Sequence, residues 1–260
     1  MEILNKAAFA LCLAGLLTGA AGVFWRLKTA EKLSQWALLA CVLSLSAALA
    51  ARWRICGRPP MTDQYESLLI LAWCVGAGGL IARRRSGVAA VGVLSCASCA
   101  AALAGASLLD PSVRPLMPAL RSDWLAYHVL TAMASYAAFA LAAAAGAWRL
   151  ISSRGAGADE PLERLMIGAL KAGFFLLTLG IATGAVWAQR AWGSYWSWDP
   201  KETWSLITWL VYAVVLHLRR AERLSGRALA WSCIAGAGVV LFTYIGVNRF
   251  LGGLHSYSGL

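Results

Sequence analysis

The sequence predicts an all-α protein that crosses a membrane many times. Of its 260 residues, 60% are hydrophobic and only 13% are charged, and the mean hydropathy is +0.65. A soluble domain of this size carries roughly a quarter charged residues. Apolar runs long enough to span a bilayer, which takes about 20 residues, recur along the chain with short loops between them. We therefore predict one polytopic helix bundle over residues 1–260, without a second soluble domain.

The predicted spans follow one another closely. They cover, in order, residues 7–25, 34–51, 65–82, 87–109, 124–148, 167–189, 204–218 and 228–251. The first is too long for the core of a cleaved signal peptide and is followed by Arg26 and Lys28, so we predict that it is retained. The third and seventh spans are expected to be short. The linker at 152–161, which is rich in glycine and serine, is expected to be the loosest segment.

Basic residues predict the orientation. The net charge of +11 could indicate nucleic-acid binding, but the Lys and Arg residues fall in short loops between apolar runs, as the positive-inside rule requires of a membrane protein. The densest groups are residues 83–85 and 219–227, which lie in the same set of alternating loops. We therefore predict that this set is cytoplasmic and that both chain termini are extracytoplasmic.

The seven cysteines form no recognisable disulfide framework. Cys96-Ala-Ser-Cys99 has the spacing of a redox motif, but it falls in an alanine-rich apolar run without a basic neighbour that would lower a thiol pKa. We interpret it as a packing face of small residues. No Cys-x-x-Cys-His motif occurs, so the chain is not itself a c-type cytochrome.

One segment carries an unusual concentration of tryptophan. Residues 192–204 read Trp-Gly-Ser-Tyr-Trp-Ser-Trp-Asp-Pro-Lys-Glu-Thr-Trp, and six of the 13 tryptophans fall between Trp187 and Trp209. Membrane boundaries favour tryptophan because its ring is apolar and its N–H needs a partner. An ordinary aromatic belt spreads one or two tryptophans over each helix end. This loop is instead predicted to form a flat aromatic platform for a large planar apolar ligand.

This segment resembles the tryptophan-rich WWD signature of haem-handling membrane proteins. Its form, continuing through Thr208-Trp209 to Leu216-His217, is most similar to the CcsA/ResC family of cytochrome c biogenesis. The resemblance implies a WWD loop at about residues 190–204 in a bacterial cytoplasmic (inner) membrane protein. It implies a subunit of a system II cytochrome c synthase, which presents haem b (iron protoporphyrin IX) at an extracytoplasmic site for thioether attachment to a Cys-x-x-Cys-His apocytochrome c. Synthase activity would require a CcsB/ResB-type membrane partner.

Two of the three histidines are predicted to reach the tryptophan loop. His128 lies near the predicted outer end of its span, and His255 follows the last span. Imidazole is a good axial ligand for haem iron, and in the family, histidines before and after the tryptophan loop are the external ligands. The alternatives are that His128 hydrogen-bonds a neighbouring helix and that His255 belongs to a solvated tail. We favour ligation, because both histidines converge on one tryptophan cluster.

His217 is predicted to have a different environment. It lies thirteen residues after Trp204, roughly 20 Å along a helix, which places it deep in the apolar layer on the cytoplasmic side. Ionisable residues at such depth are commonly functional. The resemblance implies a second haem site inside the membrane, where the partner subunit supplies the opposite ligand; the alternative is a hydrogen bond within the bundle.

Supporting residues surround the predicted external site. Asp199, Pro200 and Glu202 have the pattern of a capped helix start, which would fix the platform that Trp192, Trp196 and Trp198 form. Gly193 and Ser194 would allow the backbone to approach a porphyrin. Arg190 and Arg121 are candidate partners of the haem propionates. Glu66, which is predicted at the outer end of the third span, could have a structural role and help to hold a loop.

Two other functions share part of this pattern. A CcmC-type haem exporter or chaperone would present haem without making a thioether bond, but such proteins usually have fewer spans. A HemX-like membrane protein would regulate haem synthesis, but such proteins tend to lack the tryptophan loop. No side chain resembles a catalytic nucleophile, so the chain's contribution is expected to be placement of the reactants.

Overall fold

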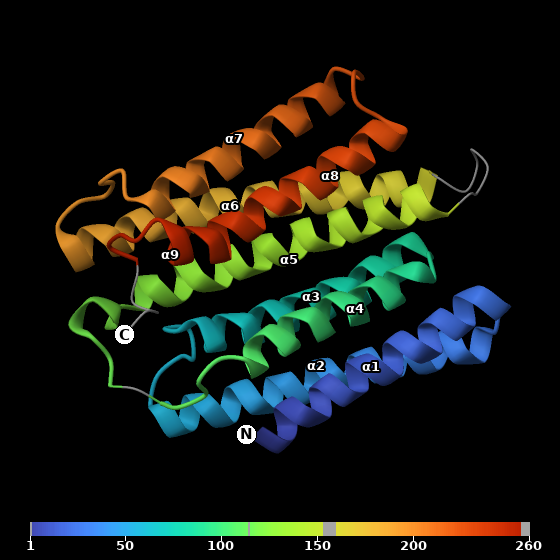
Figure 1. The fold of residues 1–260 in the computed structure, drawn as a ribbon, viewed down its shortest axis with the longest axis horizontal. Coiled ribbons are helices and arrows are strands. Elements are labelled where there is room, and N and C mark those ends of the chain that lie inside the picture. The colour runs from blue at the N-terminus through green and yellow to red at the C-terminus, as the bar shows by residue number, and fades with distance from the viewer. Residues whose placement is uncertain (1, 114, 153–159, 256–260) are drawn as a thin grey trace.

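The computed structural model describes residues 2–113, 115–152 and 160–255, and within these ranges it is entirely helical, as predicted. Long helices run side by side along one axis (Figure 1). They are α1 (Glu2–Trp25), α2 (Lys28–Cys56), α3 (Gln64–Ser86), α4 (Ala90–Ser107), α5 (Asp123–Ile151), α6 (Glu160–Trp192), α7 (Pro200–Arg220) and α8 (Gly226–Leu241). Most of the predicted linker at 152–161 lies outside the described residues.

The last span has an irregular end. After α8, the chain continues as a π-helix, η3 (Phe242–Gly246), and a short helix, α9 (Val247–Phe250), and the three together form a run of 25 residues. Among the described residues, seven helical runs are both long and apolar enough to span a membrane. The remaining helix, α7, has 21 residues, but it is less apolar. The prediction that the third span is short was wrong, because α3 has 23 residues.

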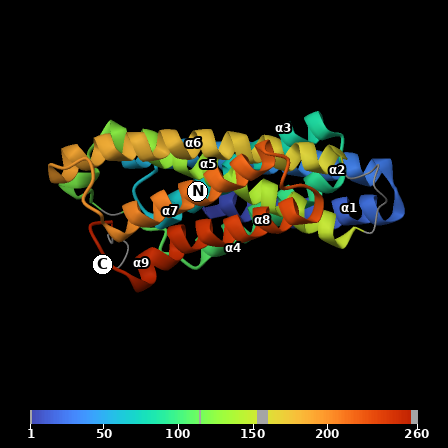
Figure 2. The same cartoon turned by 90° about the horizontal axis from the view of Figure 1, so that it is seen from above.

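The helices pack as neighbouring pairs that α5 joins. Helices α1 and α2 contact each other and, respectively, α4 and α3, while α5 packs extensively against α6 and α8 and also contacts α3 and α4. Figure 2 shows from above that the helices lie alongside one another over most of their length. Residues far apart in sequence are therefore brought together at each end of the bundle.

Five loops and chain segments that are far apart in the sequence lie at the same end of the bundle. The start of α1, the α2–α3 loop, the α4–α5 connection with its 3₁₀-helix η1 (Pro118–Leu120), the α6–α7 loop and the residues after α9 all lie there (Figure 1). The α1–α2, α3–α4 and α7–α8 turns lie at the opposite end. This alternation matches the two predicted loop sets; that the first end is extracytoplasmic remains a prediction.

The cysteines that the sequence places in apolar runs lie in the core. Cys96 and Cys99 are fully buried, and the Cys99 thiol donates to the Ala72 carbonyl of α3 at 3.2 Å. The Cys12 and Cys41 sulfurs are 3.1 Å apart, and all seven cysteines are free. The motif therefore packs against a neighbouring helix, as predicted.

A buried ion pair between α2 and α3 holds the loops at this end of the bundle in place. Arg52 on α2 is 1% exposed and Glu66 on α3 is 0% exposed, and Arg52 Nε donates to Glu66 Oε1 at 2.7 Å. The other Glu66 oxygen accepts from Arg58 Nη1 and from the Thr62 backbone N–H, both at 2.9 Å. Arg52 Nη1 also donates to the Pro111 carbonyl at 2.8 Å. The structural role considered for Glu66 is therefore confirmed: it holds the α2–α3 loop.

Replacing Arg52 by methionine is expected to destabilise the protein strongly. The substitution removes one partner of a buried pair and leaves Glu66 partly uncompensated, which typically costs about 3–5 kcal/mol. Arg164 offers the control, because its pair with Glu160 on α6 is largely exposed and such pairs contribute little. Thermal unfolding in detergent should show a large loss for Arg52→Met and almost none for Arg164→Met; equal midpoints would contradict the role of the pair.

Candidate functional site

The start of α7 is held in a fixed position next to the site by a capping box. Asp199 caps the helix, accepting from the Lys201 backbone N–H at 2.9 Å, while Glu202 Oε2 accepts from the Asp199 and Ser197 backbone N–H groups at 3.2 and 2.8 Å. Both carboxylates are buried. The capping box predicted from Asp-Pro-Lys-Glu is confirmed, and it fixes the position of the preceding tryptophan loop.

Asp199 also anchors His255. Its Oδ2 accepts from His255 Nδ1 at 2.9 Å, and its Oδ1 accepts from the Leu254 backbone N–H at 2.6 Å. The His255 side chain is only 18% exposed, so the alternative of a solvated tail is wrong. Burial lowers the pKa of His255 below its usual range, and the hydrogen bond to Asp199 opposes that shift. The neutral imidazole, which is the form that binds a metal, is therefore favoured.

His128 is held by α6. Its Nδ1 donates to the Gly180 carbonyl at 2.8 Å, because a carbonyl oxygen can only accept. Gly184, one turn further along α6, lies directly against the ring: a Cβ added there would be 2.6 Å from His128 Nδ1. The helix contact considered as an alternative for His128 thus exists, and it fixes the ring without occupying Nε2.

Trp187 connects the two histidines. Its ring stacks on His128 with a centroid distance of 6.0 Å and an interplanar angle of 13°, and it lies edge-on to His255 at 5.5 Å. Trp192 lies 4.9 Å from His255 and 4.8 Å from Trp187. Trp187 is 2% exposed, and its Nε1 donates to the Ala119 carbonyl at 2.9 Å. The structure therefore brings His128, His255 and Trp192 together as predicted, around a tryptophan that was not singled out.

Both histidines present the same nitrogen to a ligand. In each ring Nδ1 donates to an oxygen of the protein, Gly180 O for His128 and Asp199 Oδ2 for His255. A neutral imidazole that donates through Nδ1 has its lone pair on Nε2. Such partners orient metal-binding histidines and make them more basic. The residues present therefore suit a metal centre that takes two imidazole ligands.

The outer part of the tryptophan loop differs from the prediction. Trp196 and Trp198 lie at 88° to each other with centroids 5.7 Å apart, and Trp198 is 68% exposed. The loop is thus not a flat platform, because an edge-to-face arrangement of aromatic rings is preferred. Gly193 has φ +80° and Trp198 has φ +61°, so the loop turns sharply at both positions. Trp196 Nε1 is buried without a hydrogen-bond partner among the described residues.

The two predicted propionate partners lie on one small cavity. Arg121 and Arg190 both line a cavity of about 230 Å³, together with Pro118, Ala119, Ser122, Asp123 and Ala191. The Arg190 guanidinium lies 5.7 Å from the centre of the Trp124 ring. Because Ala119 also accepts from Trp187, this cavity directly adjoins the aromatic site. The site therefore has a cationic edge.

His217 does not belong to this cluster. It lies in the last turn of α7, at the other end of that helix, and its side chain is exposed. The chain therefore does not bury His217 between its own helices, and the depth of His217 in the membrane remains a prediction. Leu210 and Val214, which precede it by seven and three residues, are 49% and 56% exposed, so His217 continues an outward apolar face of α7.

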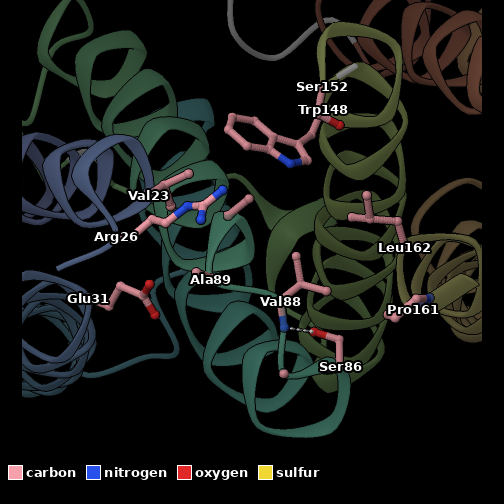
Figure 3. A pocket seen from close by; sticks show the side chains of 12 residues that line it. Val23, Arg26, Glu31, Ser86, Val88, Ala89, Trp148, Ser152, Pro161 and Leu162 are labelled. Atoms are coloured by element: carbon pink, nitrogen blue, oxygen red, sulfur yellow. Dashed lines mark hydrogen bonds between the residues drawn. The ribbon is translucent and has the colours of Figure 1, made fainter. Parts of the chain in front are cut away.

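A further cavity lies away from the histidines. It has a volume of about 500 Å³ and lies at the opposite end of the bundle, where residues from α1 to α6 and the connections between them line it. Figure 3 shows these lining side chains. Arg26, Glu31 and Trp148 line it with apolar side chains such as Leu162. No histidine in the described part of the chain lines it, and it lies apart from the candidate site.

Fold and site together define a polytopic helical membrane protein with a tryptophan-rich site that two histidines share at one end. Residues 61–255 match the family model described as Cytochrome C assembly protein. Proteins named cytochrome c biogenesis protein CcsA are similar over nearly the whole chain. That of Synechococcus sp. (strain CC9902) is 37% identical over 98% of this chain and 95% of its own length, and that of Prochlorococcus marinus (strain MIT 9303) is 36% identical over 98% and 92%. The chain therefore belongs to the CcsA family of cytochrome c assembly proteins.

A solved structure shares the fold. The protein named Cytochrome c Heme Lyase CcmF aligns with a TM-score of 0.67 at 17% identity, over 94% of this chain. The present chain spans only 45% of that protein's length. The similarity therefore shows that the helix arrangement occurs in a known larger protein, and it concerns the fold alone.

Proposed function

We propose that this chain is the haem-presenting subunit of a system II cytochrome c synthase, acting in cytochrome c maturation. The observation that carries the proposal is the convergence of His128 and His255 on Trp187, each with Nδ1 hydrogen-bonded to the protein, which leaves the Nε2 lone pair for a ligand. Haem b is the substrate that fits two imidazoles beside aromatic rings. Membership of a cytochrome c assembly family supports this choice of substrate.

The chain's residues would bind and orient that substrate. His128 and His255 would hold the iron, and Trp192 would cover the ring. Arg121 and Arg190 would pair with the propionates, since guanidinium matches carboxylate geometry. The unpartnered Trp196 Nε1 would supply a further donor at the edge.

The bond-forming step needs no nucleophile from this chain. Each thiol of a docked Cys-x-x-Cys-His apocytochrome c adds its sulfur and its proton across a haem vinyl group, giving a thioether without an external oxidant. Holding both reactants in position converts a bimolecular reaction into an effectively unimolecular one. The placement of the site at one end of the bundle, where loops surround it, is suited to docking a protein from the extracytoplasmic side.

His217 would act with a partner subunit of the CcsB/ResB type. Its side chain is exposed on the apolar face of α7 with Leu210 and Val214, which supports a role with a ligand supplied from another chain rather than from this bundle. Where no partner covers it, this face would contact membrane lipid.

Co-expression tests the proposed function directly. This chain, a CcsB/ResB-type partner and a reporter apocytochrome c should together yield haem that stays on the reporter after denaturation, and omitting this chain should reduce the yield at least roughly tenfold. A reporter with both motif cysteines changed to serine is the control and should acquire none. Haem that co-purifies with the chain while the reporter remains empty would indicate presentation without attachment and would overturn the synthase assignment.

A further inference from the structure

The segment that carries His255 is fastened to α7 by a second residue besides Asp199. Lys201, two positions further along, donates through Nζ to the Tyr244 carbonyl at 3.0 Å and to Asn248 Oδ1 at 2.9 Å. Its ammonium also lies 5.8 Å from the centre of the Tyr244 ring. A half-buried ammonium needs such partners to offset its lost hydration. Lys201 therefore bridges η3 and α9 immediately before the chain turns towards His255.

The π-helix η3 brings these acceptors to Lys201. Its wider turn is seen in the bond from the Val247 N–H to the Phe242 carbonyl, five residues apart. One inserted residue rotates everything after it by about 100° relative to a regular α-helix. Asn248 and the residues beyond it therefore face a different side than an uninterrupted α8 would give them. Gly246 permits this turn, because a Cβ there would lie 2.6 Å from the Phe242 ring.

Buried hydrogen bonds fix η3 on both sides. The Tyr244 hydroxyl and Ser67 Oγ of α3 are 2.7 Å apart, and the Thr243 and Thr208 hydroxyls, the latter on α7, are 2.8 Å apart. Thr243 and Ser67 are 1% and 8% exposed. The π-turn is thus a fixed feature of the packing, and it presents the Tyr244 carbonyl to α7 in a defined position.

Asp199 holds the distal end of the same segment. It binds Leu254 and His255, as described above, and Gly253 has φ +141° where a Cβ would overlap Asp199 Oδ1. The start of α7 therefore contacts the segment at two points, near its beginning through Lys201 and at its end through Asp199. The residues between these points, Arg249 to Gly252, are exposed and contribute little packing of their own.

We propose that Lys201 is a positioning residue for His255: with the π-turn it sets where the segment from Phe242 to His255 leaves the bundle, so that Asp199 can orient the imidazole. The consequence for haem rests on the proposed function above, whereas the consequence for the segment does not. Methionine at position 201 keeps an unbranched side chain that is only one heavy atom shorter and removes both hydrogen bonds, so it isolates the role of the ammonium.

Amide hydrogen exchange of the haem-free protein tests the position of the segment. Lys201→Met should speed exchange in residues 242–255 at least several-fold and leave residues 226–241 unchanged, since opening confined to one segment is local. Arg220→Met, an exposed residue at the other end of α7, is the control. Unchanged exchange in 242–255, or faster exchange spread over all helices, would overturn the proposal.

Haem titration of the same variants supplies a spectroscopic readout. Lys201→Met should weaken ferric haem binding by roughly tenfold, as loss of an outer contact to a ligand does, and convert part of the low-spin bis-imidazole signal to another species. Lys201→Arg, which keeps a cationic donor, should restore much of that signal. A full low-spin signal in Lys201→Met would overturn the proposal. Failure of the wild type to bind haem would instead refute the proposed function, while the exchange measurement would still decide the role of Lys201.

Discussion

Alanine in place of His128 or His255 is expected to abolish the low-spin bis-histidine spectrum of haem bound to this chain. Each substitution removes one axial ligand and leaves the other ring held by its own Nδ1 contact, Gly180 for His128 and Asp199 for His255. Haem iron with one imidazole is a different species with a different absorption spectrum, so the loss is qualitative. Affinity should also fall by at least roughly tenfold, as the loss of even outer-shell partners does.

Absorption spectra and haem content of purified wild type and variants measure this effect. Free imidazole added to either variant should restore the low-spin spectrum, because the truncated side chain leaves room for the same ligand. That rescue separates loss of a ligand from loss of the fold. A bis-histidine spectrum that persists in both single variants would refute the assignment of the two residues.

The sequence was sufficient to predict the helical spans and the capped start of α7. Hydropathy predicts the spans because a bilayer demands long apolar helices, and Asp199, Pro200 and Glu202 form the capping box that their spacing predicts. The predicted third span, 65–82, ends before the arginines at 83–85, yet these arginines continue the helix to Ser86. Hydropathy indicates where the apolar layer ends, but a helix continues for as long as its backbone hydrogen bonds do.

The parts of the site that were not predicted depend on how each helix is rotated about its axis and on how it packs against its neighbours. Depth along α7 placed His217 in the apolar layer, but the face to which a residue points depends on neighbouring helices, and His217 shares an exposed face with Leu210 and Val214. The π-turn has no evident sequence signal. Trp187 precedes the dense part of the motif, and five residues along a helix do not put two side chains on the same face. Its contact with Trp192 is therefore evident only from the packing of the two rings.

The convergence of the two histidines was predicted, but its geometry was not. Resemblance to a family implied that His128 and His255 serve one site. It could not show that a glycine carbonyl of α6 orients one ring while the cap of α7 orients the other. Such contacts join residues far apart in the chain, and each depends on the packing of whole helices.

Gly184→Ala is expected to disable the site without removing a ligand. The added Cβ would lie 2.6 Å from His128 Nδ1 and 2.9 Å from Cε1, closer than packed atoms approach, so the ring must move. Movement breaks the hydrogen bond from His128 Nδ1 to the Gly180 carbonyl, and with it the constraint that fixes the ring beside Trp187. Haem affinity should fall by roughly tenfold or more, in the range seen for loss of partners that orient metal-binding histidines.

Gly168→Ala on the same helix is the matched control, because a Cβ at Gly168 meets nothing within 4 Å. Alanine is favoured over glycine within a helix by roughly 0.5–1 kcal/mol, so this variant should unfold at a slightly higher temperature and bind haem normally. Gly184→Ala gains the same helical preference and should remain folded, which separates damage to the site from damage to the bundle. Equal haem affinity in the two variants would mean that His128 binds from a position other than the one Gly180 fixes, and that α6 does not orient the ligand.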